Sequence, residues 1–280
     1  MLKHPMPDPV AFHIGSWPIH WYGLMYVLAF FLFIALGRQR LKLPHIAAQG
    51  WKKEDLDDML FYGMLGVIIG GRMGEVLFYQ PLHFLHNPLE IFKVWTGGMS
   101  YHGGFIGVLL AMWLWSRKAG RNLLDVYDFI APLVPLGYAC GRLGNFINHE
   151  LPGRPADPSL PWAMWWPTPD SPLDNPVWLA QPVHPSPLYQ MAIDGLLVFV
   201  IVWWFARKPR PRLAVGALYV LLYGCARFFT EWFRVPDWQT TILGLPITSG
   251  QVLSLPMIVA AIAMLVWAYR RPAGPAPARG

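Results

Sequence analysis

The segment from residue 141 to 153, GRLGNFINHELPG, gathers polar side chains at the end of an apolar stretch. Within nine positions it holds Arg142, Asn145, Asn148 and Glu150, and it follows directly on the apolar run from Phe129 to Cys140. Ionisable side chains at the edge of a membrane are costly unless they are partnered, so they usually mark a functional site. The glycines and asparagines of the segment also predict a bent backbone whose polar groups need partners.

The composition indicates the class of protein in which this site must work. Of the 280 residues, 55% are hydrophobic and 14% are charged, whereas soluble domains carry about a quarter charged residues. We therefore expect an integral membrane protein, with 15 Trp and 11 Tyr available for the interfacial belts. The basic residues lie in short runs between apolar segments, so we do not expect the clustered basic face of a nucleic-acid-binding protein.

Seven apolar stretches are about long enough to cross a membrane, at roughly 17–25 residues each. They predict a single all-α membrane domain over residues 1–280. The expected spans are 20–37, 56–79, 101–116, 122–140, 188–206, 214–231 and 250–269.

The lysines and arginines between these spans predict their orientation. Fifteen of the 22 basic residues lie after spans one, three and five or in the C-terminal tail. Because cytoplasmic loops are enriched in Lys and Arg, we expect the N-terminus outside, on the periplasmic side, and the C-terminus in the cytoplasm, with a flexible cytoplasmic tail at 271–280. The largest outer segment, about 141–187, contains eleven prolines between Pro152 and Pro187, which predict a compact, irregular head region.

This orientation places polar residues of five spans at a similar depth near the outer side. They are Tyr26, Arg72, His102, Arg142, Arg227 and Glu231. Tyr223, Arg227 and Glu231 are four residues apart and share one face of span six. A self-neutralising Arg227–Glu231 pair is one interpretation, but the common depth with Arg142 and His102 favours a shared site.

Two arginines near the outer headgroups suit a phosphate, because guanidinium groups make bidentate, charge-assisted bonds to phosphate oxygens. An anionic phospholipid would bring such a group to this depth. Histidine exchanges protons near neutral pH, so His102 is a candidate proton acceptor. A hydrogen-bonded interfacial histidine is the alternative, although Gly103 and Gly104 would allow a ligand to approach closely.

Structural roles are expected for several other polar residues. Glu75 lies three residues from Arg72, and we expect the two to neutralise each other. Asp125 and Asp128 are expected to complement the dipole at the start of span four. Ser249 is expected to cap the helix of span seven.

Cysteines and glycines are best explained by packing. Cys140 and Cys225 both lie in apolar runs, so we expect them to be buried without forming a disulfide. Small residues four apart let membrane helices approach closely. Glycines with this spacing include Gly66, Gly70 and Gly74 in span two, and Gly103 and Gly107 in span three.

The segment at 141–153 resembles the signature of prolipoprotein diacylglyceryl transferases, G-R-x-G-N-F-x-N-x-E-x-x-G, at every fixed position. The resemblance extends to MSYHGG at 99–104, KPRP at 208–211 and YGCARFFTEWFR at 223–234, and it covers the chain from Trp17 to Arg271. One departure is HPSPLYQ at 184–190, where the family typically reads H-P-S-Q-L-Y-E. Pro187 and Gln190 thus replace a glutamine and a glutamate.

This resemblance implies an enzyme of the bacterial inner membrane with seven helices and an outer head. It implies transfer of a diacylglyceryl group from phosphatidylglycerol, a membrane lipid, to the lipobox cysteine next to a prolipoprotein signal peptide. A thioether forms and glycerol phosphate leaves, and no metal or other cofactor is implied. The matching positions implied to be catalytic are Tyr26, His102, Arg142, Arg227 and Glu231, and those implied to bind substrate are Arg142, Asn145, Asn148, Glu150, Gly153, Tyr223 and Arg227. For Gly153 the residue type itself indicates a backbone constraint.

Three alternatives belong to other classes. A lipid or solute transporter would extend polar residues into the inner halves of the spans, which are poor in them apart from Asp125 and Asp128. A non-catalytic scaffold gives no reason for His102, Arg142 and Arg227 to converge. An intramembrane hydrolase would need a nucleophile, and the sequence has neither a G-x-S-x-G elbow nor an H-E-x-x-H motif.

Overall fold

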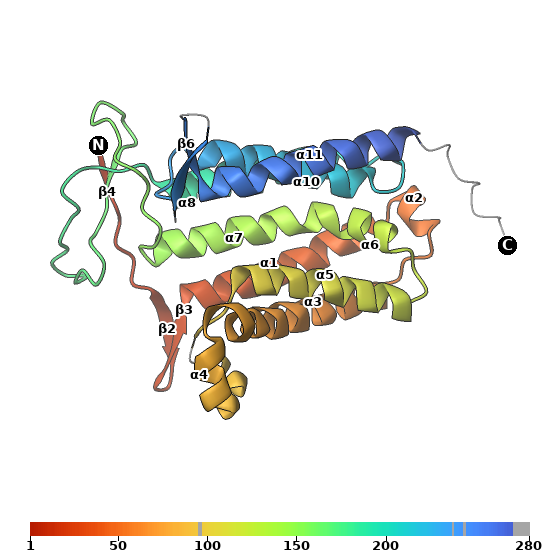
Figure 1. Ribbon diagram of the computed structural model, residues 1–280, viewed down its shortest axis with the longest axis horizontal. Helices are drawn as coiled ribbons and strands as arrows, with labels where there is room; N and C mark the ends of the chain where they lie inside the picture. The colour runs from red at the N-terminus through yellow and green to blue at the C-terminus, as the bar shows by residue number, and fades with distance from the viewer. Residues whose placement is uncertain (95–96, 237, 243–244, 271–280) are drawn as a thin grey trace. The chain divides into compact units, whose positions relative to one another are not determined.

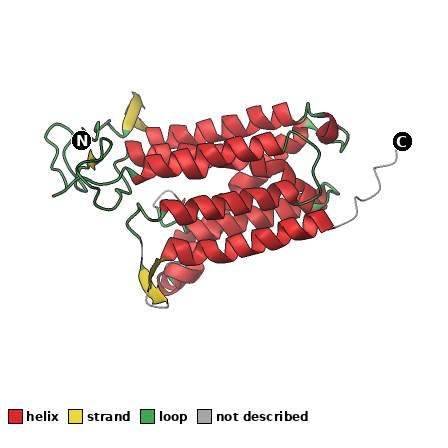
Figure 2. Cartoon of the chain, turned by 90° about the horizontal axis from the view of Figure 1, so that it is seen from above, coloured by secondary structure: helices red, strands yellow, loops and turns green. Residues whose placement is uncertain are grey.

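The computed structural model describes residues 1–94, 97–236, 238–242 and 245–270, so the tail expected at 271–280 lies outside the described residues. The chain is mostly helical (Figure 2). The α-helices are α1 (Trp21–Arg40), α2 (Pro44–Ala47), α3 (Lys53–Gly74), α4 (Pro81–His86), α5 (Tyr101–Lys118), α6 (Leu123–Ile130), α7 (Val134–Ile147), α8 (Ser186–Gln190), α9 (Val198–Phe205), α10 (Ala214–Thr230) and α11 (Ser249–Arg270). Tighter or wider helical turns are η1 (Glu75–Tyr79), η2 (Pro88–Phe92), η4 (Ala131–Leu133) and η5 (Met191–Leu197).

Five helices among the described residues are long and apolar enough to cross a membrane. They are Trp21–Arg40, Lys53–Tyr79, Leu123–Ile147, Ser186–Phe205 and Ser249–Arg270, which coincide with expected spans one, two, four, five and seven. Helix α10, at the sixth, is apolar but has 17 residues. Helix α5, at the third, has 18 residues, with polar side chains in its first and last turns. The protein is therefore a mostly helical, multi-pass membrane protein, and the full set of seven spans stays a prediction.

The chain divides into two compact units. One comprises residues 1–33 and 128–280, and the other comprises residues 34–127. Helix α1 thus contributes its first part to the larger unit and its remainder to the smaller one.

The smaller unit is built on the close packing of α3 against α5. A Cβ atom added at Gly66 would lie 2.6 Å from the carbonyl oxygen of Gly107, and one at Gly74 would lie 2.8 Å from the Cα atom of Gly103. Side chains at these positions would push the helices apart. The packing role predicted for the four-residue glycine spacing is confirmed.

Arg72 has a different partner from the one we expected. Its guanidinium donates to the carbonyl oxygens of Ile91 (2.9 Å), Gly97 (2.8 Å), Gly98 (3.1 Å) and Glu90. Glu75 instead accepts a hydrogen bond from the side chain of Gln80 at 2.9 Å. The predicted Arg72–Glu75 pair is therefore wrong, because carbonyl groups of η2 and of the segment that follows it satisfy the buried guanidinium.

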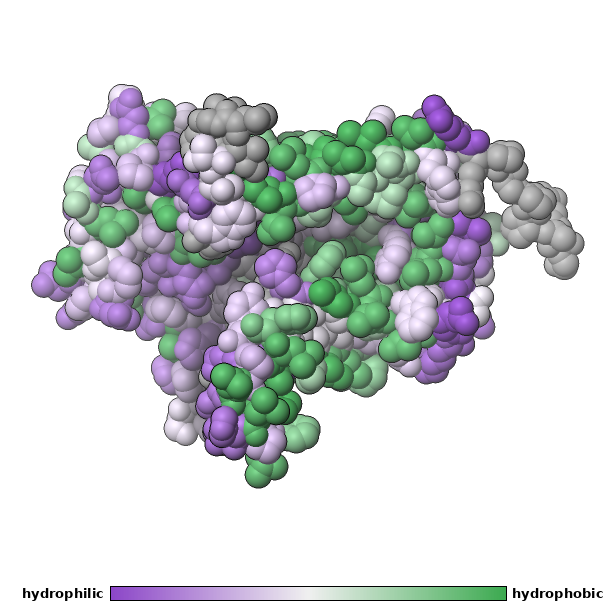
Figure 3. All heavy atoms as spheres, viewed as in Figure 1, coloured by the Kyte–Doolittle hydropathy of each residue, from purple (hydrophilic) through white to green (hydrophobic). Residues whose placement is uncertain are grey.

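The larger unit packs α7, η5, α9, α10 and α11 together. Figure 1 shows α10 and α11 side by side, and Figure 3 shows hydrophobic residues over this pair and hydrophilic residues over the head region. Gly195 in η5 lets α7 approach, because a Cβ atom there would lie 2.7 Å from the Cβ atom of Ala139. A buried apolar cluster stabilises these contacts: Ala131, Val198, Val202, Ala206, Val215 and Ala226.

Two residues with predicted roles at helix starts have other roles in the structure. Asp128 accepts the backbone N–H groups of Leu213 and Gly216 (2.7 Å to Gly216), so it caps α10 rather than its own helix. At α11, Thr248 and Gln251 form a reciprocal capping pair, at 3.4 and 3.2 Å. The prediction for Ser249 was off by one residue.

The predicted burial of the two cysteines is confirmed at one position only. Neither cysteine forms a disulfide, and Cys140 is buried, but Cys225 is exposed on α10. An apolar run in a membrane helix has one face toward lipid, so burial does not follow from apolar neighbours alone.

The chain also contains short strands that the sequence patterns did not reveal. Strands β1 (Leu2–Lys3) and β4 (Met164–Trp165) pair in parallel, β2 (Val10–Ile14) and β3 (Trp17–His20) form one hairpin, and β5 (Gln239–Ile242) and β6 (Leu245–Thr248) form another.

His4 connects the N-terminal segment to the head region through hydrogen bonds and ring contacts. Its ring donates to the carbonyl oxygen of Phe146 (3.0 Å), accepts from the backbone of Met6 (3.1 Å) and packs against Trp166. Burial lowers the pKa of His4 to about 4, so the ring is neutral at physiological pH.

Candidate active site

Helix α7 carries the polar segment and runs further than we expected. It continues through Gly141 and Gly144 to Ile147, with Asn148 as its C-cap. The predicted bend comes after the helix, where His149 and Leu151 have positive φ values of 61° and 57°. The glycines inside the helix serve another purpose at position 144, since a Cβ atom there would lie 2.7 Å from the ring of Tyr22.

The polar side chains at the end of α7 form one chain of hydrogen bonds. Arg142 donates to the amide oxygen of Asn145 at 3.2 Å, and Asn145 donates to the carboxylate of Glu150 at 2.7 Å. Asn148 donates to the other oxygen of Glu150 at 3.3 Å. The amide oxygen of Asn148 is buried and has no hydrogen-bond partner among the described residues.

The end of α10 carries a second charged cluster. Arg227 forms an ion pair with Glu231, whose side chain is fully buried, and Arg234 lies 4.0 Å from the same carboxylate. The backbone N–H of Gly250 at the start of α11 also points to Glu231, at 3.4 Å. The interpretation of Arg227 and Glu231 as a pair is thus correct, and it leaves further guanidinium N–H groups for a ligand, because arginine has five.

Tyr138 and Asp194 connect the clusters on α7 and α10. Tyr138 donates to Asp194 at 3.1 Å, its ring lies 5.5 Å from that of Tyr223, and the guanidinium of Arg142 lies 4.8 Å from its centre. Both Arg142 and Arg227 interact electrostatically with Tyr138 and Asp194. The structure therefore brings the two arginines to one site.

Tyr26 reaches this site through its neighbour on α1. Its side chain is about half exposed, at 49%, and its ring lies 5.3 Å from that of Tyr22. Tyr22 packs over Gly144 and interacts electrostatically with Glu150 and Arg142. Tyr26 is thus placed at the same end of α7 as the polar chain.

The family of this chain is shown by its similarity to known proteins. A model of the family described as "Prolipoprotein diacylglyceryl transferase" matches residues 9–267. A protein of Janthinobacterium sp. (strain Marseille) is 66% identical over 97% of this chain and 99% of its own length. Relatives from Cupriavidus pinatubonensis (56% identical, covering 98% of this chain and 95% of the relative) and Burkholderia thailandensis (50%, covering 97% and 98%) are also similar. All three relatives are named phosphatidylglycerol–prolipoprotein diacylglyceryl transferase.

The chain belongs to the prolipoprotein diacylglyceryl transferase family.

The region matched to the diacylglyceryl transferase family includes every residue that we expected at the site, from Tyr26 to Glu231. His102 lies in the smaller unit, in the first turn of α5, where Ser100 caps the helix by accepting from the backbone of Gly103 at 3.1 Å. Its role stays a prediction, as do the individual roles of the residues in the larger unit.

The last glycine of the diacylglyceryl transferase signature, Gly153, holds two backbone segments together. Its N–H donates to the carbonyl oxygen of His184 at 3.0 Å, and Arg154 donates to that of Phe233 at 2.9 Å. A Cβ atom at Gly153 would lie 2.6 Å from the Phe233 oxygen and still closer to the His184 oxygen. The expected backbone constraint is confirmed, and its cause is the close approach of three chain segments.

Gly153→Ala should therefore destabilise the protein, and Gly141→Ala from the same signature is the matched control. Overpacking next to rigid carbonyls costs about 1–3 kcal/mol, which corresponds to a thermal midpoint lower by roughly 2–4 °C per kcal/mol. A Cβ atom at Gly141 meets no atom within 4 Å, so this variant should keep or raise the midpoint. Thermal unfolding in detergent measures both. Equal midpoints for the two variants would contradict the packing argument.

Sequence reasoning missed Asp194, the most deeply buried acid near the arginines besides Glu231. Asp194 has no exposed surface and accepts hydrogen bonds from Thr230 (3.1 and 3.2 Å) as well as from Tyr138. The signal was present, because Asp194 is the acidic residue within an otherwise apolar span, and an intramembrane acid is a candidate functional residue by default.

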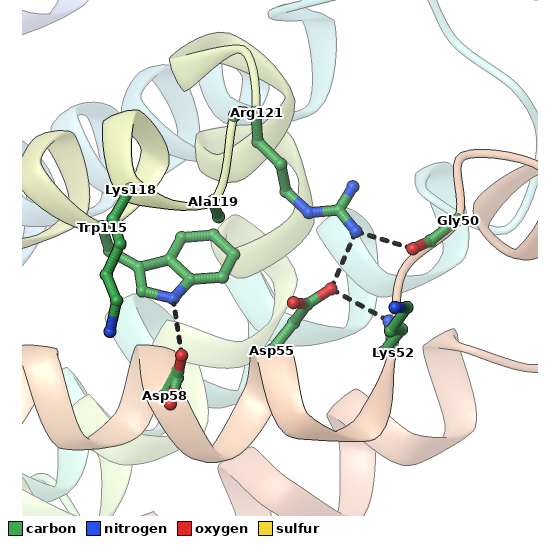
Figure 4. Close-up of a pocket in the computed structure, with 9 residues that line it drawn as sticks. Gly50, Lys52, Asp55, Asp58, Trp115, Lys118, Ala119 and Arg121 are labelled. Atoms are coloured by element: carbon green, nitrogen blue, oxygen red, sulfur yellow. Dashed lines mark hydrogen bonds and ion pairs between the residues drawn. The ribbon is translucent and has the colours of Figure 1, made fainter.

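A pocket in the smaller unit has a different character. It has a volume of about 480 Å³ and lies between the start of α3 and the end of α5 (Figure 4). Its charged groups are engaged with their neighbours: Arg121 binds Asp55 at 2.8 Å and the carbonyl oxygen of Gly50 at 2.7 Å, and Trp115 donates to Asp58 at 3.4 Å. These bonds join the loop at Gly50 to the end of α5, so the pocket is explained by a structural connection between the two.

Proposed function

We propose that this protein transfers the diacylglyceryl group of phosphatidylglycerol to the lipobox cysteine of prolipoproteins, in the inner membrane of a bacterium. The observation that carries the proposal is that Arg142 and Arg227 both interact with Tyr138 and Asp194. The names of relatives that are 50–66% identical over nearly the full chain support the same reaction. Seven spans, with the N-terminus outside, would place this site at the outer leaflet.

Arg142 and Arg227 are proposed to bind the phosphate of the lipid. The side chain of Arg227 is 16% exposed, so a phosphate bound there is largely removed from water. Charge-assisted bonds to guanidinium groups are strong in such surroundings. As the phosphate diester becomes a monoester, it gains negative charge, and preorganised donors stabilise that charge in the transition state.

The reaction forms one bond and breaks another at a single carbon. The sulfur of the lipobox cysteine attacks the diacylglycerol carbon that carries the phosphate, a C–S bond forms, and the C–O bond to the phosphate breaks. The bonding electrons leave with glycerol phosphate. Only a thiolate is a good nucleophile, and we assign removal of the thiol proton to His102.

Neutral and acidic groups at the end of α7 are proposed to orient the glycerol headgroup. Asn148 holds a buried amide oxygen that has no partner in the described part of the chain, which suits a hydroxyl donor on the substrate. Glu150 is exposed and is held by Asn145 and Asn148, so its position is defined before a substrate arrives. Tyr26, whose ring packs against Tyr22, and Tyr223, whose ring packs against Tyr138, are proposed to border this region.

The predicted orientation can be tested with single cysteines in a background of Cys140→Ala and Cys225→Ser. Ser159→Cys, in the proline-rich head, should react with a membrane-impermeant thiol reagent added to intact cells. Ala119→Cys, just after α5, should react only after the membrane is opened. Both positions are exposed, so access to the reagent depends on the side of the membrane. The reverse labelling pattern would contradict an outer-leaflet site.

The proposed activity can be tested by following the leaving group. Purified protein incubated with phosphatidylglycerol vesicles and a lipobox peptide should release glycerol phosphate in proportion to the peptide. A peptide with serine in place of the lipobox cysteine should release none, because the attacking thiolate is missing. Equal release with both peptides would indicate lipid hydrolysis and would contradict the proposed transfer.

A further inference from the structure

A buried carboxylate beneath the two arginines has no part in the reaction as described so far. Asp194 lies in η5, a π-helical stretch of Met191–Leu197, and π-helical turns often occur at functional sites. Its side chain is fully buried. A buried carboxylate is costly unless its surroundings compensate for the lost water, so its partners indicate why it is there.

The direct partners of Asp194 are neutral donors. Tyr138 donates from α7 at 3.1 Å, and Thr230 donates from α10 at 3.1 and 3.2 Å. Gly195 next to it allows the close approach of α7. These contacts fix the carboxylate between three helices and leave its negative charge intact.

That charge acts on both arginines without occupying their donors. Arg142 and Arg227 interact electrostatically with Asp194, while the guanidinium group of Arg142 donates to Asn145 and that of Arg227 donates to Glu231. The charged groups near the site are three arginines, Arg142, Arg227 and Arg234, and three acids, Glu150, Asp194 and Glu231. Asp194 thus offsets one positive charge while the arginines keep N–H groups for a ligand.

We propose that Asp194 is a positioning and counter-charge residue that limits how tightly the two arginines hold the phosphate of the leaving group. This inference rests on the proposed function. Glycerol phosphate carries more negative charge than the lipid diester, so the one positive charge left in excess without Asp194 would favour binding of the product over the substrate. A fixed negative charge weakens product binding most and thereby speeds release.

The test is direct binding of glycerol phosphate to the detergent-solubilised protein, measured by titration calorimetry. Asp194→Asn keeps the shape and an acceptor oxygen but removes the charge, so glycerol phosphate should bind about tenfold more tightly. In the transfer assay, kcat should fall at least about fivefold while KM for phosphatidylglycerol does not rise, because release becomes slow. Asp194→Glu keeps the charge and should bind glycerol phosphate within about threefold of the wild type.

Two further variants separate charge from structure. Thr230→Val removes a hydrogen bond to Asp194 but keeps its charge, so product affinity should change less than in Asp194→Asn. Asp194→Ser, a smaller neutral residue, should tighten product binding as Asp194→Asn does, and thermal unfolding checks that both proteins fold.

Three outcomes would count against these ideas in distinguishable ways. Unchanged or weaker product binding in Asp194→Asn, with an active wild type, would overturn the inference alone. A wild type that binds glycerol phosphate but transfers nothing would overturn the proposed function, and the binding comparison would still decide the role of Asp194. A wild type that binds no glycerol phosphate and also transfers nothing would overturn both.

Discussion

The Arg142→Lys variant should transfer diacylglyceryl groups on the order of 10²-fold more slowly than the wild type. An ammonium is a point charge and lacks the planar fork that binds two phosphate oxygens at once. Arg142 is also positioned by the ring of Tyr138 and the amide of Asn145, and lysine cannot reproduce both contacts. The loss should therefore exceed what a change of charge alone would cause.

Arg227→Lys should show a loss of similar size for the same reason. Lysine keeps a positive charge beside Glu231, so this buried acid is not left unpaired and the protein should still fold. Arg38→Lys is the matched control, because Arg38 is exposed in the last turn of α1, and its rate should stay within about twofold of the wild type. Initial rates with phosphatidylglycerol and a lipobox peptide measure all three. Near-wild-type rates for both site variants would remove the phosphate clamp from the mechanism.

His102→Gln should lower transfer at neutral pH by about 10²–10⁴-fold, the usual contribution of a general base. Binding of phosphatidylglycerol should change little, because the phosphate ligands are elsewhere. Raising the pH should partly restore activity, since a free thiol has a pKa of about 8.5 and more of the peptide thiol then ionises without help.

The control for this variant is His13→Gln, at an exposed histidine of the β2–β3 hairpin. It should keep full activity at every pH. A His102→Gln protein whose expression and lipid binding fall together, with no rescue at high pH, would show a structural role instead. Full activity of His102→Gln would exclude both roles.

The membrane class and the places of the spans could be predicted from sequence because they depend on local composition. The structure has a helix at each of the seven expected stretches, and five of them satisfy both length and hydropathy. Helix ends were harder to predict. Helix α7 runs seven residues past Cys140, where we expected span four to end, because Gly141, Arg142 and Gly144 all accept helical geometry. The chain turns only at His149 and Leu151, which have positive φ values.

Partners across the fold could not be predicted, because they depend on tertiary contacts. Asp128 caps α10, 85 residues away, and Arg72 holds the loop around Gly97 instead of its helical neighbour Glu75. The short strands β1 and β4 pair residues more than 160 positions apart, and two-residue strands carry no periodic signal.

The arginines and the α7 residues of the candidate site could be proposed from sequence, because the signature is contiguous and five of the expected spans carry a polar residue near the outer end. Their individual roles stay predictions. Asp194 was missed because the other residues of η5 are all apolar or glycine, so it stands apart from the polar signature in the sequence. Its connection to the site depends on Tyr138 and Thr230, which resemble ordinary helix residues in the sequence.

The central claim is that this protein joins a diacylglyceryl group to a cysteine thiol, and the mass of the acceptor peptide tests it most directly. Purified protein, phosphatidylglycerol and a lipobox peptide should yield a peptide heavier by one diacylglyceryl group, attached through a thioether that resists mild alkaline hydrolysis. The Arg142→Lys protein should yield far less of this product over the same time. A peptide of unchanged mass after incubation with the folded, lipid-bound wild type would contradict the account.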